Sequence, residues 1–178
     1  MTRQVALLRG INVGGRNKLP MGPLRTAIED LGYLDVRTHL QSGNVVFTTG
    51  TPPEQTATEI EQLIADRFAL AVRVVIRTHA ELAEVVSGNP LPEAARDPAR
   101  FLVTFLSAAP DHGVVRTLES AAYAPDVFRV QGREVYLHCP NGIRDSKLAA
   151  FPWGKRLELT ATARNWNTVT RLLALAAE

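Results

Sequence analysis

Cysteine is almost absent from this sequence, which contains a single one, Cys139, among 178 residues. One cysteine cannot form an intramolecular disulfide bond, and it excludes a zinc site built from several thiolates. This content is typical of a protein of the reducing cytoplasm, and a cytoplasmic location is what we expect. The four histidines lack the HxH and HExxH spacings, so the sequence predicts no metal site.

Long apolar runs are absent as well. A stretch such as residues 172–177 is far shorter than the ~20 residues that cross a bilayer. The residues after Arg3 lack the apolar core of a signal peptide. We therefore expect neither a membrane span nor secretion through a signal peptide. What the chain does have is enough length to bury one substantial core or two smaller ones.

Acidic side chains are missing from residues 1–28, which carry five basic ones. Residues 144–171 carry six more, against two acidic side chains, whereas residues 29–143 hold nine basic and fifteen acidic ones. The net charge of +2 therefore conceals two cationic ends and an acidic middle. Clustered positive charge attracts anionic partners, so we expect an anionic ligand.

The hydrophobic pattern of residues 1–79 predicts the element order βαββαβ. A proline-containing capping box at residues 51–54 marks the start of the second helix, and Gly32 is placed to cap the first. This order is typical of a ferredoxin-like α+β fold, and we expect residues 1–79 to form such a domain. The expected strands are residues 4–9, 36–40, 44–49 and 72–76, and the first helix is residues 21–31.

Residues 80–178 are expected to form a second, smaller α+β domain with a C-terminal helix, packed against the first. The proline-rich segment 89–92 is typical of a crossing between domains, and a capping box at residues 78–81 opens a helix before it. The second half begins βαββ like the first, without a convincing sequence repeat. The expected elements are a strand at 101–106, a helix at 111–122, a hairpin of 127–130 and 135–137, a short helix after Asp145, and a final helix at 165–176.

A glycine-rich loop, residues 9–18, follows the first predicted strand. Glycines at 14 and 15 permit positive φ, and the neighbouring Arg9 and Lys18 suit a phosphate or carboxylate. The loop matches neither the Walker A nor the GxGxxG spacing, and the alternative is a sharp turn with solvated arginines. Residues 41–44 (QSGN) are more typical of a hairpin turn than of a site. We expect this turn at the opposite end of the sheet from the loop, with the first and third strands running parallel.

Two polar segments lie in the cationic C-terminal part of the chain. Ser146 and Lys147 stand at the start of a predicted helix, where Asp145 or Ser146 caps the helix or the Ser-Lys pair binds an anion. Residues 162–169 combine a helix cap, at Thr162 or Asn165, with a predicted cationic helix face. The side chains on that face are Arg164, Asn167, Thr168 and Arg171.

The ordered series of these motifs resembles DUF1697, a family of uncharacterised bacterial proteins. The matching segments are RGINVGGRN (9–17), QSGNVVF (41–47), NPLP (89–92), YLHCPNGIRDSKL (136–148) and ARNWNTV (163–169). The resemblance implies a two-part α+β protein with a ferredoxin-like N-terminal half, and it implies no activity. The recurring motifs of the family fall on Arg9, Asn12, Ser42, Asn44, Ser146, Lys147, Arg164, Asn165 and Asn167.

From the charge pattern and the motifs we expect a small anionic ligand, a nucleotide or a phosphorylated metabolite, in a cleft between the two halves. The alternatives are a nucleic-acid-binding module that uses the basic terminal segments and a structural or adaptor domain. The sequence identifies no cofactor and no catalytic residue, so it leaves open whether the protein is an enzyme. The expected ligand-binding residues are Arg9, Asn12, Gly14, Gly15, Lys18, Ser42, Asn44, Ser146, Lys147, Arg164, Asn165 and Asn167.

Overall fold

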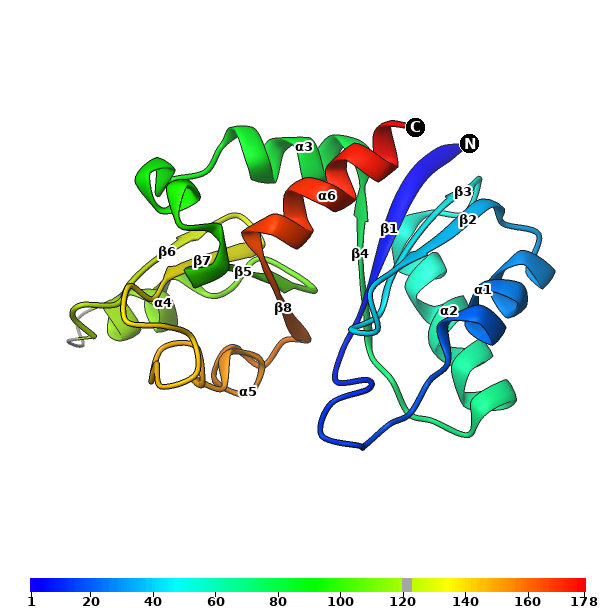
Figure 1. Cartoon of the computed structure of the whole chain (residues 1–178), viewed down its shortest axis with the longest axis horizontal. Helices are drawn as coiled ribbons and strands as arrows, with labels where there is room; N and C mark the ends of the chain where they lie inside the picture. The colour runs from blue at the N-terminus through cyan, green and yellow to red at the C-terminus, as the bar shows by residue number, and fades with distance from the viewer. Residues whose placement is uncertain (120–122) are drawn as a thin grey trace. The chain divides into compact units, whose positions relative to one another are not determined.

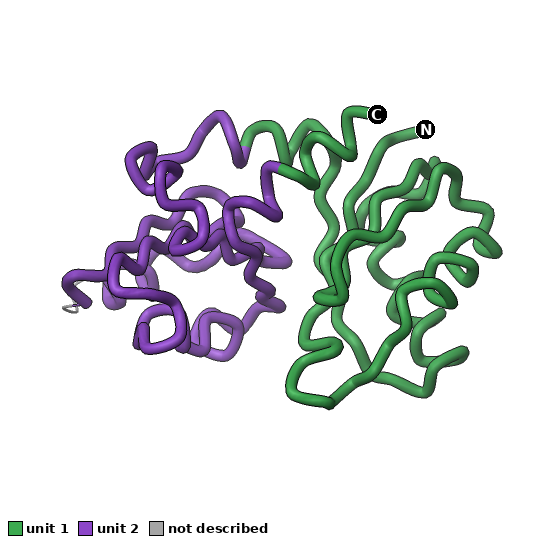
Figure 2. The backbone as a smooth tube through the Cα atoms, in the orientation of Figure 1, with its two compact units in different colours: residues 1–84, 171–178 green, residues 85–170 purple. Residues whose placement is uncertain are grey.

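Residues 1–119 and 123–178 are described by a computed structural model. The chain divides into unit 1, residues 1–84 with 171–178, and unit 2, residues 85–170, which Figure 2 colours separately. Helix α3 (His79–Ser87) begins in unit 1 and ends in unit 2, and helix α6 (Trp166–Ala177) returns to unit 1. The expected domains, 1–79 and 80–178, stay a prediction, and they differ from the units in residues 80–84 and 171–178.

Unit 1 has the predicted order βαββαβ, and its four strands form one antiparallel sheet in the order β2-β3-β1-β4. Helices α1 and α2 lie on the same face of this sheet (Figure 1). The sequence predicts an apolar stripe of Met21, Leu24, Ile28 and Leu31 for this first helix, α1. The first three are buried in the core between the helices and the sheet, whereas Leu31 follows the end of α1 and is 39% exposed. The elements are β1 (Thr2–Leu8), α1 (Met21–Asp30), β2 (Leu34–His39), β3 (Asn44–Thr49), α2 (Pro53–Phe68) and β4 (Val74–Thr78).

The expected direction of the strands was wrong, and the correction matters for the site. Strand β1 pairs with β3 in antiparallel orientation, with Val5 opposite Val46. Strand β3 is also antiparallel to β2, so β3 returns between two strands that run the same way. The end of β1 and the start of β3 therefore lie at the same end of the sheet.

The two capping boxes had different outcomes. The box at residues 78–81 is confirmed, because the Thr78 amide donates to Glu81 Oε2 (2.8 Å) and the Glu81 amide donates to Thr78 Oγ1 (3.2 Å). The box at residues 51–54 was wrong, because α2 begins at Pro53 with Pro52 as its N-cap and has no side-chain cap bond. Proline fits the first helical position without loss of a hydrogen bond, so the prolines set the start of this helix.

Unit 2 forms a second four-stranded antiparallel sheet, in the order β6-β7-β5-β8. The short helix expected after Asp145 was wrong: turns follow this residue, and the next helix begins at Trp153. Residue 122, the predicted end of the helix at 111–122, lies outside the described residues. The elements are two 3₁₀ turns (Pro92–Arg96 and Pro98–Arg100), β5 (Phe101–Leu106), α4 (His112–Glu119), β6 (Val127–Gln131), β7 (Glu134–His138), α5 (Trp153–Leu157) and β8 (Ala161–Asn165).

The two units repeat one plan of connections. Val5 pairs with Arg77 across β1 and β4, and Val103 pairs with Arg164 across β5 and β8. The irregular backbone bonds at the sheet ends correspond too. In unit 1 the Leu8 amide donates to the Gly43 carbonyl, and the Arg9 amide donates to the Arg73 carbonyl. At the equivalent positions of unit 2, the Leu106 amide donates to the Arg133 carbonyl and the Ser107 amide to the Thr160 carbonyl. The repeat that the sequence leaves unseen is thus present in the hydrogen-bond register.

Each unit departs from this common plan in a segment that carries a polar motif. Residues 9–20 join β1 to α1, whereas the equivalent link in unit 2 needs only residues 107–111. In unit 1 the 16-residue helix α2 follows β3, whereas turns at residues 139–152 and the five-residue helix α5 follow β7. The extra length of the first link and the turns after β7 are therefore not required by the shared topology.

The mixed α+β class predicted from the sequence is confirmed by the two sheets and their helices. Among the residues that the structure describes, no helix combines the length and the apolar character that crossing a membrane requires. The same residues contain no group of His, Cys, Asp and Glu side chains that could hold a metal ion.

Candidate functional site

The glycine-rich loop, called here the basic loop (residues 9–18), is fixed by its own asparagines. The Asn12 Nδ2 group donates to the carbonyls of Leu19 (3.0 Å) and Gln41 (2.7 Å), and Asn12 Oδ1 accepts from the Leu19 amide (2.9 Å). Asn17 Nδ2 donates to the Gly10 carbonyl (3.0 Å). Both amide hydrogens and the oxygen of Asn12 are used inside the fold, so this side chain holds the loop in place.

The tip of the basic loop is a tight two-residue turn. Val13 and Arg16 form an isolated antiparallel bridge, and the Arg16 amide donates to the Val13 carbonyl (3.0 Å). Gly14 and Gly15 both have positive φ, 56° and 76°, as such a hairpin turn requires. A Cβ at either position would meet open space, so the positive φ, and not a close contact, is what favours glycine here.

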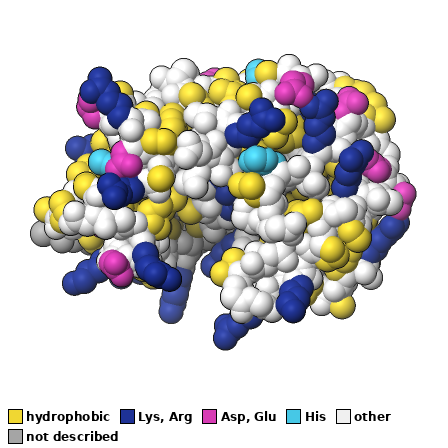
Figure 3. Space-filling model, viewed as in Figure 1, with side chains coloured by type: hydrophobic (Ala, Val, Ile, Leu, Met, Phe, Trp, Pro, Cys, Tyr) yellow, Lys and Arg dark blue, Asp and Glu magenta, His cyan; other side chains and the backbone are white. Residues whose placement is uncertain are grey.

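The basic loop presents unpaired positive charge. Arg9, Arg16 and Lys18 are exposed, and their side chains form no hydrogen bond or ion pair within the described part of the chain. Figure 3 shows Lys and Arg side chains projecting where the link between β1 and α1 lies in Figure 1. The loop also exposes Val13, whose accessibility is 65%. It is therefore a rigid, cationic projection with an apolar tip.

The turn at residues 40–43 lies against this loop, contrary to the expectation of opposite ends. The bond from Asn12 to the Gln41 carbonyl joins them, and the antiparallel pairing of β1 with β3 brings them to one end. Asn44 is fully buried and donates to the His39 carbonyl (2.7 Å) and Ser42 Oγ (3.2 Å), which shapes the turn, and Ser42 is exposed. The structure thus brings together the predicted site residues of unit 1: Arg9, Asn12, Gly14, Gly15, Lys18, Ser42 and Asn44.

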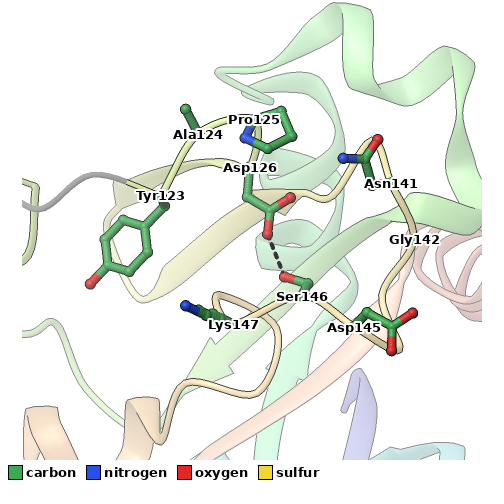
Figure 4. Close-up of a pocket in the computed structure, with 9 residues that line it drawn as sticks. All are labelled: Tyr123, Ala124, Pro125, Asp126, Asn141, Gly142, Asp145, Ser146 and Lys147. Atoms are coloured by element: carbon green, nitrogen blue, oxygen red, sulfur yellow. Dashed lines mark hydrogen bonds between the residues drawn. The ribbon is translucent and has the colours of Figure 1, made fainter.

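Unit 2 contains a pocket of about 290 Å³ around Ser146 and Lys147. Figure 4 shows its two walls, one from the segment before β6 and one from the turns after β7. Sequence reasoning missed the wall before β6, because no local pattern links Asp126 to a segment 20 residues away. The pocket is lined by Tyr123, Ala124, Pro125, Asp126, Asn141, Gly142, Asp145, Ser146 and Lys147.

The hydroxyl of Ser146 links the two walls of the pocket through hydrogen bonds. Its Oγ donates to Asp126 Oδ2 (2.6 Å, Figure 4), and it accepts from the Ala149 amide (2.9 Å) and from the Cys139 thiol (3.3 Å). One donor and two acceptor positions are then all occupied. Burial raises the pKa of the Cys139 thiol, which keeps this sulfur protonated at neutral pH. Ser146 is therefore placed to hold the pocket walls together.

The charge of this pocket does not favour an anion. Lys147 is exposed and lines it, but the carboxylates of Asp126 and Asp145 line it as well. Two negative groups and one positive group give the lining a net negative charge. The chemistry of the pocket therefore differs from that of the basic loop, although the sequence places both in cationic segments.

Arg164 lies on strand β8 and is buried, so the expected helix face that included it was wrong. Its Nη1 group donates to Thr162 Oγ1 (2.8 Å) and to the Ala163 carbonyl (2.8 Å). Burial lowers the pKa of Arg164 to about 10. The alternation of buried Thr162 and Arg164 is a strand pattern that the polar composition of this segment concealed.

Asn165 is the cap of α6, because its Oδ1 accepts from the Thr168 amide (2.9 Å), as one of the two predicted alternatives stated. Thr168 is buried rather than on a cationic face, whereas Asn167 is exposed on the first turn of the helix. None of Arg164, Asn165 and Asn167 lines the pocket around Ser146.

The family described as "Protein of unknown function (DUF1697)" matches residues 1–136. The chain belongs to the DUF1697 family. A solved structure similar to this DUF1697 protein is that of the conserved bacterial protein SP0830 from Streptococcus pneumoniae, with 24% sequence identity and a TM-score of 0.80 over 98% of each chain. That likeness shows the fold of the DUF1697 chain from end to end. No curated protein matches it.

Proposed function

We propose that this protein binds an anionic, phosphate-bearing ligand through the basic loop of unit 1. The observation that carries the proposal is the combination of fixed backbone and unpaired charge. Arg9, Arg16 and Lys18 project from a loop whose shape is set by internal hydrogen bonds. A binding surface that is already ordered loses little entropy when it meets its ligand.

The length of the loop supports the same proposal. Unit 2 joins its equivalent strand and helix through residues 107–111, so the fold itself has no need for residues 9–20 at this place. Loops that exceed what a fold requires are where binding residues concentrate. The amides of Gly14 and Gly15, which have no partner among the described residues, add donors beside the cations.

The test is titration with pyrophosphate, a simple probe that carries the expected chemistry. The loop variant combines Arg9→Gln, Arg16→Gln and Lys18→Gln. We expect the wild-type protein to bind pyrophosphate and the loop variant to bind it at least about tenfold more weakly, because hydrogen bonds to charged groups contribute 1.5–3 kcal/mol each. Isothermal titration calorimetry measures both constants.

A control variant removes the same charge from paired positions of unit 1. Arg25, Arg67 and Arg73 are exposed arginines that already form ion pairs with Glu29, Asp30 and Glu61. Replacing all three with glutamine changes the net charge as the loop variant does. An equal loss of pyrophosphate binding in both variants, or no binding to the wild type, would contradict the proposed function.

A further inference from the structure

Taking the proposed function as given, we infer that the anionic partner of the basic loop is a duplex nucleic acid, contacted through its phosphates. The inference rests on three properties of the loop: its convex shape, the number of its free cations and the apolar side chain at its tip. Each property favours a duplex over a small phosphate ligand or over a single strand.

The shape of the loop is convex where a small ligand would need a cavity. Val13 at the tip is 65% exposed in the whole chain, and a Cβ at Gly10, Gly14 or Gly15 would meet open space. Sites for small molecules usually enclose 70–90% of the ligand surface. A projecting tip can bury its contact area only against a partner that supplies the concave side, and the grooves of a duplex do so.

The charge of the loop matches a row of phosphates. Arg9, Arg16 and Lys18 are three cations within ten residues that form no ion pair with any described residue, on a backbone fixed by the Asn12 and Asn17 bonds. These cations stand at the two ends of the loop and beside its turn, so a partner with several phosphates offers each of them a contact of its own. A duplex carries a negative charge about every 1.7 Å along its axis. Each phosphate that a cation neutralises releases counterions, and this release favours binding.

The apolar tip favours a duplex over a single strand. The loop contains no aromatic side chain, so it lacks the stacking platform on which proteins hold unpaired bases. It exposes Val13 instead, and Leu40 in the neighbouring turn is 54% exposed. Architectural proteins insert apolar side chains, leucine among them, between base steps of the minor groove and contact that groove with arginines and lysines.

The experiment measures binding of the full chain to a fluorescent duplex of about 20 base pairs at several salt concentrations, by anisotropy. The slope of log K against log salt is expected to shrink by about 0.9 for each cation removed, hence by about 2.7 in the loop variant. The control variant keeps the wild-type slope. Val13→Ser lowers the affinity and leaves the slope unchanged, because it removes an apolar contact and no charge.

Parallel titrations separate this inference from the proposed function. If pyrophosphate binds through the loop while the duplex does not bind, or if the loop variant keeps the wild-type slope, the inference is overturned and the proposed function stands. Tighter binding of the single strand, or loop-dependent binding to vesicles of anionic lipid without binding to the duplex, overturns it as well. Failure of both pyrophosphate and the duplex to bind ends both proposals.

Discussion

Replacing Gly43 with alanine is expected to lower the free energy of unfolding by about 3 kcal/mol or more, the largest loss we expect from any single added methyl group. A Cβ at this position would lie 2.5 Å from Ile11 Cδ1 and 2.8 Å from Leu8 Cβ. Both neighbours are buried, and Leu8 is part of the sheet, so they have little room to move. The φ of Gly43, +87°, adds the strain of a left-handed conformation.

Gly15→Ala is the matched comparison. Gly15 also has positive φ, but a Cβ there would meet no atom within 4 Å. Only the conformational strain remains, roughly 1–2 kcal/mol. Urea denaturation followed by circular dichroism gives both values. Equal losses for the two variants would mean that the close contact between the turn and the basic loop is not the source of the cost.

Ser146→Ala is expected to destabilise the protein by roughly 2–4 kcal/mol, because it removes three hydrogen bonds at once. The substitution leaves the Asp126 carboxylate without the donor that holds it 2.6 Å away, and the Ala149 amide without its acceptor. An unsatisfied charged or polar group that is partly buried costs more than the lost bond itself. Thermal unfolding monitored by calorimetry measures the change.

A double-mutant cycle identifies which bond carries the loss. If the bond between Ser146 and Asp126 dominates, Ser146→Ala and Asp126→Asn are coupled by roughly 1–3 kcal/mol. Strict additivity of the two substitutions would contradict that assignment. It would leave the bonds to Ala149 and Cys139 as the main contribution of the serine.

Much of the fold could be predicted because its signals are local. The strand at residues 101–106 and the capping box of Thr78 and Glu81 are each specified by residues close together in the sequence, and both are present as predicted. The cap of α6 at Asn165 is equally local. Such patterns depend on the period of the backbone and on bonds to the nearest amides, which a sequence displays directly.

The candidate site was harder to predict from the sequence because its geometry depends on contacts between residues that are far apart in the chain. The basic loop and the turn before Asn44 meet only because β3 runs antiparallel to β1. The residues of the loop contain no pattern that indicates this strand direction. The partner of Ser146 is Asp126, which stands beside no recognisable motif. Arginine side chains are usually solvated, but Arg164 lies on strand β8, where it stands at one of the alternating positions that are buried.

The measurement that tests the central claim most directly is a titration of ¹⁵N-labelled protein with pyrophosphate, followed by nuclear magnetic resonance. We expect the largest shifts of amide signals to fall on Gly14, Gly15 and Arg16 and to saturate together. We also expect the loop variant to abolish them. Largest shifts at residues 141–147 of the pocket in unit 2, or no saturable shift in residues 9–18, would contradict the assignment of the anion site to the basic loop.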